Sequence, residues 1–270
     1  MDRRTDHTDH TGEPFRLGYD EAGEGPPLVL VHGFPFDRRM WAHQLEGLAE
    51  IRRVVAVDLR GRGLSPHPAG GGWTIDDHAD DVARTIEALS AGPVDVGGLS
   101  MGGYVVFALL RHHPQLVRSI VLMGTRADAD SPEVRTRRDQ QAAQARAEGT
   151  EALADWFLPM VVAPGAGEGV RTTVRRMIAD IPGDTAAADL VALRDRADST
   201  PDLASIDVPT LVLHGDEDQA VPVDVARAMA RAIPGAQFSA VPAAGHLAPL
   251  ENPTDANVDL QLFLARVSGG

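Results

Sequence analysis

Short, uniformly apolar runs separated by longer amphipathic segments constrain the fold of this chain most. The runs lie in "PPLVLVHGF" (26–34), "RRVVAVDLRGRG" (52–63), "SIVLMGT" (119–125) and "PTLVLHGDED" (209–218). Strands without polar alternation are typical of parallel sheets that helices cover on both faces. Between them, "TIDDHADDVARTIEALS" has the apolar spacing of a helix, with Thr74 as the expected N-cap. The alternation predicts an α/β fold with a doubly wound, mostly parallel sheet.

The strand rhythm stops near Arg126 and resumes near Ile206. Residues 126–205 contain helix-like pieces, such as "TEALADWFLPMVV" and "AAADLVALRDRA", and no clear buried strand. We therefore predict a helical cap at 126–205, inserted into a core domain that comprises residues 14–125 and 206–270. Residues 1–13 are predicted to form a mobile tail, and their histidines and aspartates are interpreted as solvated rather than metal-binding.

Composition excludes several classes of function. The formal net charge of −14 disfavours a nucleic-acid or anionic-membrane partner. The absence of cysteine excludes disulfides and thiol catalysis, and the absence of lysine excludes Schiff-base chemistry. We read no signal peptide and no apolar run long enough to span a bilayer. We expect a cytoplasmic protein without metal or cofactor, and the sequence leaves its oligomeric state open.

The stretch "VDVGGLSMGGYVVF" places Ser100 between a predicted strand and a predicted helix. Gly98-Leu99-Ser100-Met101-Gly102 matches the pattern G-x-S-x-G. The pattern alone is weak, because glycine-rich chains meet it by chance. Its strand-to-helix context is typical of a nucleophilic serine, whose hydroxyl is exposed by a strained turn while small neighbours let helix and strand pass closely. We predict that Ser100 is a nucleophile.

A serine nucleophile needs a base and an acid that orients it. His246, in "AAGHLAPLENP", is the candidate base, since its loop and the Ser100 turn would face the same crevice of a doubly wound sheet. "HGDEDQAVP" offers Asp216, Glu217 and Asp218 directly after a strand. The position further into the loop favours Asp218 over Asp216, because the carboxylate must reach across the crevice.

Negative charge on a reacting carbonyl needs hydrogen-bond donors. The backbone N–H of Phe34, in "VHGFPFD", and that of Met101 are the candidate oxyanion donors. "DWFLPMVV" gathers Trp156, Phe157, Leu158 and Met160 in the predicted cap. We predict that one or more of these residues contact the substrate, with Trp156, Phe157 and Met160 as the candidates, since ligand pockets are mostly apolar. The alternative is that they only pack the cap against the core domain.

In "LVHGFP", "VDLRGRGLS", "VGGLSMGG", "LVLHGDEDQAVP" and "AGHLAPLENP", the chain resembles the α/β-hydrolase superfamily over nearly all of its length. The resemblance implies Ser100 as nucleophile, Asp218 as acid, His246 as base and the N–H groups of Phe34 and Met101 as oxyanion donors. Within the superfamily, the sequence looks most like cofactor-free carboxylesterases and 3-oxoadipate enol-lactonases.

The sequence thus predicts a serine hydrolase that cleaves a small carboxylic ester or lactone through an acyl-enzyme. The same residues would also suit a cofactor-free perhydrolase or a hydrolase of C–C bonds. An alternative of a different class is a ligand-binding receptor built on a hydrolase fold. The sequence does not identify the substrate.

Overall fold

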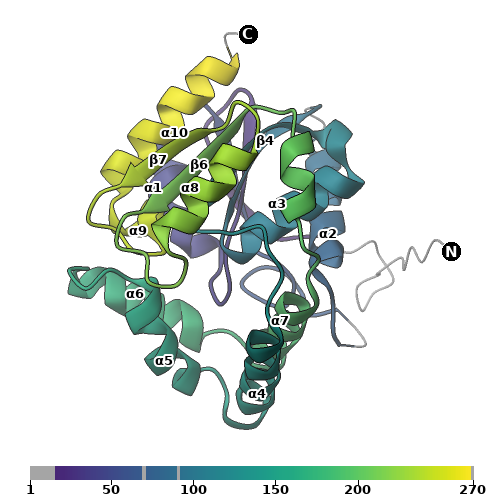
Figure 1. Ribbon diagram of the computed structural model, residues 1–270, viewed down its shortest axis with the longest axis vertical. Helices are drawn as coiled ribbons and strands as arrows, with labels where there is room; N and C mark the ends of the chain where they lie inside the picture. Colours follow the sequence, from purple (N-terminus) through teal and green to yellow (C-terminus); the bar gives the residue numbers. More distant parts are fainter. Residues whose placement is uncertain (1–15, 69–70, 90–91, 269–270) are drawn as a thin grey trace, which may run out of the picture.

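The computed structural model describes residues 16–68, 71–89 and 92–268, which form a sheet with helices on both sides and a group of helices at one end (Figure 1). The predicted tail, residues 1–13, lies outside the described residues.

The sheet has seven strands in the order β1-β3-β2-β4-β5-β6-β7. Only β1 is antiparallel to its neighbour, β3, and the other neighbours are parallel. Every residue of β2 is buried, as its uniformly apolar run predicted. Every residue of β4 is buried as well. The strands are β1 (Tyr19–Ala22), β2 (Pro27–Val31), β3 (Arg53–Val57), β4 (Val94–Leu99), β5 (Val117–Met123), β6 (Thr210–Gly215) and β7 (Gln237–Val241).

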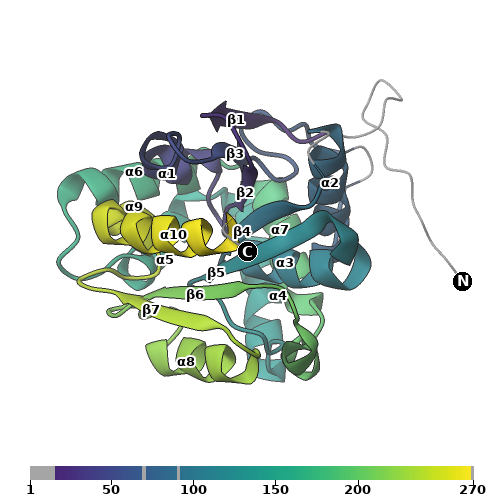
Figure 2. The ribbon, with the colours of Figure 1, turned by 90° about the horizontal axis from the view of Figure 1, so that it is seen from above.

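Helices cover both faces of the sheet, so the predicted doubly wound fold is confirmed. Seen from above in Figure 2, α1 (Ala42–Gly47) and α10 (Pro253–Ser268) lie on one side. On the other side lie α2 (Ile75–Ala88), α3 (Met101–His112) and α8 (Val223–Ala232). The short elements are η1 (Arg38–Trp41), η2 (Pro114–Leu116), η3 (Thr200–Ser205) and α9 (Ala248–Glu251).

Helix α2 begins where the sequence predicted. The Thr74 hydroxyl accepts a hydrogen bond from the Asp77 N–H at 3.1 Å, and the Asp77 carboxylate accepts one from the Thr74 N–H at 2.8 Å. This reciprocal pair satisfies two N–H groups that have no partner inside the helix.

Four helices lie between β5 and β6, and we call them the cap: α4 (Pro132–Glu148), α5 (Glu151–Val161), α6 (Glu168–Ala179) and α7 (Gly183–Asp195). They gather below the sheet in Figure 1, where α4 packs on α7 and α5 on α6. Helix α6 was not singled out from the sequence. The α4–α7 pair is fixed to the core by Asp189, a buried carboxylate that accepts hydrogen bonds from Arg62 and from Trp73 Nε1 at 2.7 Å.

Candidate active site

A cavity of about 250 Å³ lies between the cap and the ends of the strands, and it brings together most of the predicted site. The core supplies Ser100, His246 and Phe34 to its wall. The cap supplies all three predicted substrate contacts: Trp156, Phe157 and Met160. Residues that lie far apart in the sequence therefore face one small space.

Ser100 occupies a sharp turn between β4 and α3. Its backbone has φ 54° and ψ −112°, a left-handed conformation that is strained for a residue with a side chain. Two contacts fix the turn against β5: the Ser100 N–H donates to the Met123 carbonyl at 2.8 Å, and the Thr125 hydroxyl donates to the Ser100 carbonyl at 2.8 Å. In the described part of the chain, the Ser100 hydroxyl has no hydrogen-bond partner, and it lies in a residue that lines the cavity.

Two glycines make this turn possible by letting backbones approach. A Cβ on Gly98 would lie 2.2 Å from the Gly102 carbonyl oxygen. A Cβ on Gly102 would lie 2.2 Å from the Val31 carbonyl oxygen. Both contacts are impossible for a side chain, so strand and helix pass as closely as the sequence predicted.

Of the three adjacent acids, Asp218 is the one that contacts His246. The distance from His246 Nδ1 to Asp218 Oδ2 is 2.8 Å. The other oxygen of Asp218 accepts from the N–H groups of Ala220 and Val221 at 2.8 and 2.9 Å. Asp216 and Glu217 are exposed. Because an ionised carboxylate only accepts, Nδ1 of His246 carries hydrogen, and Nε2 of the neutral ring is left with a free electron pair.

The loops after β6 and β7 bring Asp218 and His246 together, because these strands are parallel neighbours. The Glu217 N–H donates to the Ala244 carbonyl at 2.9 Å, and the Asp216 N–H donates to the Val241 carbonyl at 3.0 Å. A Cβ on Gly215 would lie 2.0 Å from the Gly245 carbonyl oxygen. Close backbone contact thus fixes the two loops against each other.

A second histidine, which the sequence analysis did not assign to the site, also contacts Asp218. His214 Nε2 lies 3.1 Å from Asp218 Oδ2 and 2.8 Å from the Val221 carbonyl oxygen. Since a carbonyl only accepts, Nε2 of His214 carries hydrogen and points at both oxygens. The position of His214 at the end of β6, four residues before Asp218, was the only signal in the sequence.

Electrostatics favour an ionised Asp218 and a basic His246. Burial alone would raise the pKa of Asp218, but the charge and hydrogen bonds of His246 and His214 outweigh it and hold the pKa well below its usual range. Burial would lower the pKa of His246, but Asp218 outweighs it, with a contribution from Glu251, and the pKa lies above its ordinary 6.5. A neutral His246 is therefore a stronger base than a free imidazole.

The candidate oxyanion donors belong to residues close to Ser100: Phe34 shares its cavity, and Met101 follows it in the sequence. Phe34 lines the cavity, and Met101 is buried at the first turn of α3. Within the described residues, neither backbone N–H has a hydrogen-bond acceptor. Both N–H groups are therefore available to a ligand.

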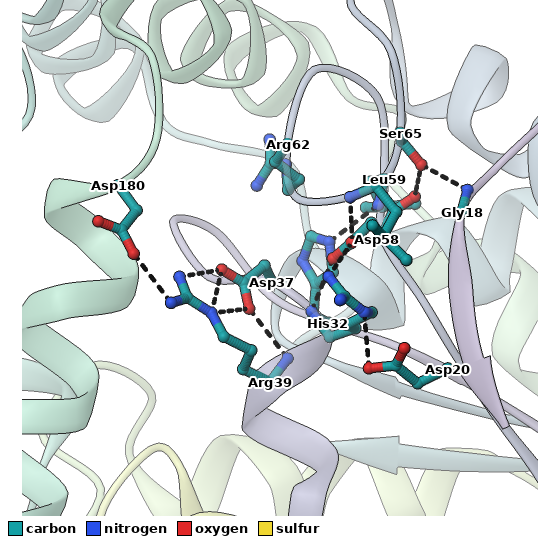
Figure 3. A network of polar contacts seen from close by, with 12 residues as sticks. Gly18, Asp20, His32, Asp37, Arg39, Asp58, Leu59, Arg62, Ser65 and Asp180 are labelled. Carbon is teal, nitrogen blue, oxygen red and sulfur yellow. Dashed lines mark hydrogen bonds and ion pairs between the residues drawn. The ribbon is translucent and has the colours of Figure 1, made fainter. Parts of the chain in front are cut away.

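The loop that carries Phe34 is held by His32, whose surroundings Figure 3 shows. The Leu59 N–H donates to His32 Nε2 at 3.0 Å, so Nδ1 carries hydrogen and donates to the Gly33 carbonyl at 2.9 Å. Burial, assisted by the charge of Arg62, lowers the pKa of His32 to about 3 and keeps the ring neutral. His32 thus joins the loop after β2 to the turn after β3, a structural role.

The cap side of the cavity contains charged residues that the sequence analysis missed: Arg126, Asp130, Arg137, Arg138 and Arg196. No pattern in the sequence would have selected them, because α4 carries arginines at adjacent positions and is polar on most of its surface.

Among the described residues, no group of three or more histidines, aspartates or glutamates is arranged to hold a metal ion. None of the described helices combines the length and apolar character that crossing a membrane requires.

Comparison with known proteins decides the family. The model of the alpha/beta hydrolase fold family matches residues 26–177 and 178–253. This chain is an α/β hydrolase.

Solved structures agree with this assignment. A thermophilic esterase from Thermogutta terrifontis, solved with malate bound, is 38% identical with a TM-score of 0.92, and the match covers 97% of each chain. An enol-lactonase from Burkholderia xenovorans LB400 is 32% identical with a TM-score of 0.84, over 92% of this hydrolase and 96% of that chain.

Among characterised sequences, this hydrolase is 31% identical over 256 residues to a pyrrolizixenacetamide deacetylase of Xenorhabdus hominickii, covering 92% of this chain and 94% of that protein. Other matches have the names of non-heme peroxidases and of a 2-hydroxymuconate semialdehyde hydrolase. The family of enzymes is thus shown, while its members carry out several reactions on small molecules.

Proposed function

We propose that this α/β hydrolase is a serine hydrolase that cleaves a carboxylic ester or lactone through an acyl-enzyme. One observation carries the proposal: the strained turn presents Ser100 to the same cavity as His246, whose Nδ1 is bound by a buried Asp218 at 2.8 Å. This arrangement supplies a nucleophile, a base and the group that orients the base.

In the proposed reaction, the Ser100 oxygen attacks the ester carbonyl while His246 Nε2 takes the hydroxyl proton. The carbonyl oxygen becomes an oxyanion, which the N–H groups of Phe34 and Met101 stabilise. The carbonyl re-forms, the C–O bond to the alcohol breaks, and His246 returns the proton to that alcohol. Water then attacks the acyl-enzyme with His246 as base, releasing the acid and restoring the serine.

The direct test is hydrolysis of p-nitrophenyl butyrate and of small lactones, followed from the first milliseconds. An initial burst of p-nitrophenol, labelling by a serine-directed phosphonate, and loss of both in Ser100→Ala would support the proposal. Failure to turn over any ester, together with no labelling of the folded wild-type protein, would refute it.

Product analysis separates the remaining reactions. Peracid formation from acetate and hydrogen peroxide would indicate a perhydrolase, and cleavage of a β-diketone would indicate a C–C hydrolase. Ligand binding at micromolar concentration without measurable turnover would instead indicate a receptor on a hydrolase fold.

A further inference from the structure

The wall of the cavity has the opposite charge to the protein as a whole. The chain has a formal net charge of −14, yet Arg126, Arg137, Arg138 and Arg196 line the cavity beside Ser100. Among the described residues, the one aspartate or glutamate in this lining is Asp130. A positive patch of this kind needs an explanation in a protein that is acidic overall.

Asp130 contacts two of these arginines, but its single negative charge neutralises only one of them. Its side chain is 6% exposed, its Oδ2 accepts from Arg138 Nε at 2.9 Å, and its Oδ1 lies 2.7 Å from Arg196 Nη1. Arg126 is balanced by Asp128, at 2.6 and 2.5 Å. Arg137 is exposed and makes no hydrogen bond or ion pair with the described part of the chain. Setting aside the Arg126–Asp128 pair, the cavity lining thus has three guanidiniums, those of Arg137, Arg138 and Arg196, and one carboxylate, that of Asp130.

Arg196 also contains a buried donor without a partner. The residue is 5% exposed, and its guanidinium lies 4.3 Å from the centre of the Tyr104 ring. Its Nη groups donate to the Leu193 and Asp128 carbonyls, each at 2.9 Å. Its Nε–H has no acceptor among the described residues. An unsatisfied buried donor is costly. The Arg196 guanidinium therefore keeps positive charge at this wall of the cavity that protein acceptors satisfy only in part.

Anchoring of the cap explains only part of this arrangement. The pair of Arg196 with Asp130 links the segment after α7 to the segment before α4, and Arg138 contributes its Nε to the same carboxylate. The Nη groups of Arg138 and all donors of Arg137 remain free in the described part of the chain. Arg137 and Arg138 both line the cavity, and a guanidinium with free donors binds the two oxygens of a carboxylate in a fork geometry.

We propose that the substrate of this hydrolase carries a carboxylate, remote from its scissile bond, that binds Arg137 and Arg138 with Arg196 behind them. That the scissile bond is an ester rests on the proposed function. The anion site rests on the arginines alone. Trp156, Phe157 and Met160 line the same cavity and suit a short aliphatic chain between the two ends. The volume of about 250 Å³ limits the substrate to a small molecule. The substrate class is therefore a half-ester of a short dicarboxylic acid.

Binding is tested first, without catalysis, in Ser100→Ala protein by calorimetry. Monomethyl glutarate carries the anion, dimethyl glutarate is its neutral counterpart, and inorganic phosphate is the competing anion. We expect monomethyl glutarate to bind at least tenfold more tightly than dimethyl glutarate. Arg137→Gln and Arg138→Gln should each weaken its binding by about tenfold, the size expected for a charged hydrogen bond.

Arg135→Gln is the matched control. Arg135 lies on the same helix, is exposed like Arg137, and is not part of the cavity wall. Its substitution removes the same charge from the protein and should leave the affinity for monomethyl glutarate unchanged. Melting temperatures identify any variant that is misfolded, and the exposed position of Arg137 keeps at least that variant informative.

Turnover gives the second measurement. We expect the ratio of kcat/KM for mono-p-nitrophenyl glutarate to that for p-nitrophenyl pentanoate to exceed one in the wild type, after correction for spontaneous hydrolysis. The ratio should fall in Arg137→Gln and Arg138→Gln and stay constant in Arg135→Gln.

The outcomes separate the two proposals. Equal binding of the two glutarate esters, with a ratio that no arginine variant changes, would overturn the carboxylate site while leaving an esterase. Tight binding of phosphate in place of monomethyl glutarate would also overturn it. Arginine-dependent binding in Ser100→Ala, with no ester cleaved by the wild type, would overturn the proposed function and leave the anion site in place.

Discussion

The two walls of the cavity are built in different ways. On the core side, the backbone determines the positions: the left-handed turn of Ser100, the contact between Gly98 and Gly102, and the N–H groups of Phe34 and Met101. On the cap side, side chains determine them: an edge-to-face contact of Phe157 with Phe34 at 5.5 Å and the buried ion pairs of Asp130.

This difference suggests a division of tasks. A backbone arrangement that only glycine permits leaves little freedom for change, whereas a side chain on a helix can be exchanged without altering the fold. We therefore expect substitutions on the core side to affect every substrate, and substitutions on the cap side to change which substrate is preferred. The predictions below test that division, from the largest effect to the smallest.

Among substitutions on the core side, Asp218→Asn should reduce the activity of the enzyme most severely. Asparagine keeps the shape but offers His246 the wrong hydrogen-bond pattern, and the equivalent change in a serine protease lowers kcat by about 10⁴. We expect a loss of several powers of ten that is the same for all esters, measured as kcat. Asp216→Asn is the control, because Asp216 is exposed, and it should cause only a modest loss. Inactive Asp216→Asn with nearly normal Asp218→Asn would show that the acid is misassigned.

Among substitutions that loosen the attachment of the cap to the core, Asp189→Asn should lower the free energy of unfolding most. Asp189→Asn removes one partner of a buried pair with Arg62, which typically costs about 3–5 kcal/mol in the free energy of unfolding. Urea denaturation measures this loss, and Asp184→Asn, an exposed change on the same helix, should have little effect. A loss below about 1 kcal/mol would contradict a firm attachment.

The same carboxylate predicts a pH dependence of stability. Burial would raise the pKa of Asp189, but the charge of Arg62 and the hydrogen bonds of His78 and Trp73 lower it to about 2. Its contribution is thus present above the ordinary value of 3.8 and is lost as the pH falls toward 2. The difference in stability between wild type and Asp189→Asn should shrink over that range.

The apolar part of the cap wall should determine the preferred chain length. Phe157→Ala and Met160→Ala enlarge the cavity, so we expect kcat/KM to shift toward longer acyl chains by about tenfold, the size of one or two methylene contacts. Leu158→Ala is the control, since Leu158 lies on the same helix, packs against the buried apolar cluster and is not part of the cavity wall. An unchanged preference with a lower melting temperature would mean that these residues only pack the cap.

The smallest effect concerns the pH dependence of activity. His246 must be neutral to accept a proton. Its raised pKa therefore places the acid limb of the pH profile of kcat/KM above pH 6.5. Because Glu251 contributes to the raised pKa, Glu251→Gln should move this limb to lower pH. A limb that stays in place would show that Glu251 does not act on His246.

The contribution of His246 to the free energy of unfolding should change with pH in the opposite direction to the activity. A raised pKa stabilises the folded state below the ordinary value of 6.5, and the contribution disappears as the pH rises through the folded-state pKa. Activity therefore increases over the range in which this contribution to stability is lost. Parallel pH profiles of kcat/KM and unfolding free energy would detect the divergence.

Much of the core side was predictable from the sequence because its signals are local. Apolar runs identified the buried strands, Thr74 identified the start of α2, and the glycines around Ser100 indicated the strained turn. Each of these signals depends on residues within a few positions of one another. The parallel order of the strands then placed the loops that carry Asp218 and His246 at one edge of the sheet.

The cap side was decided by tertiary structure. The sequence indicated helices and an apolar cluster at Trp156, but it did not show which arginines of α4 face the cavity. Arg196, Asp130 and Arg138 meet only because α4 packs on α7. The contact of His214 with Asp218 likewise depends on how the loop after β6 folds back.

The sequence by itself therefore determined the fold class and the candidate nucleophile, base and acid, because the strand and turn signals are local and the resemblance to α/β hydrolases implies the same residues. Only the tertiary structure placed a buried carboxylate between two guanidiniums and left neighbouring donors free beside Ser100. The physical reason is that charge pairing depends on distances between side chains of separate helices, and no local pattern encodes those distances.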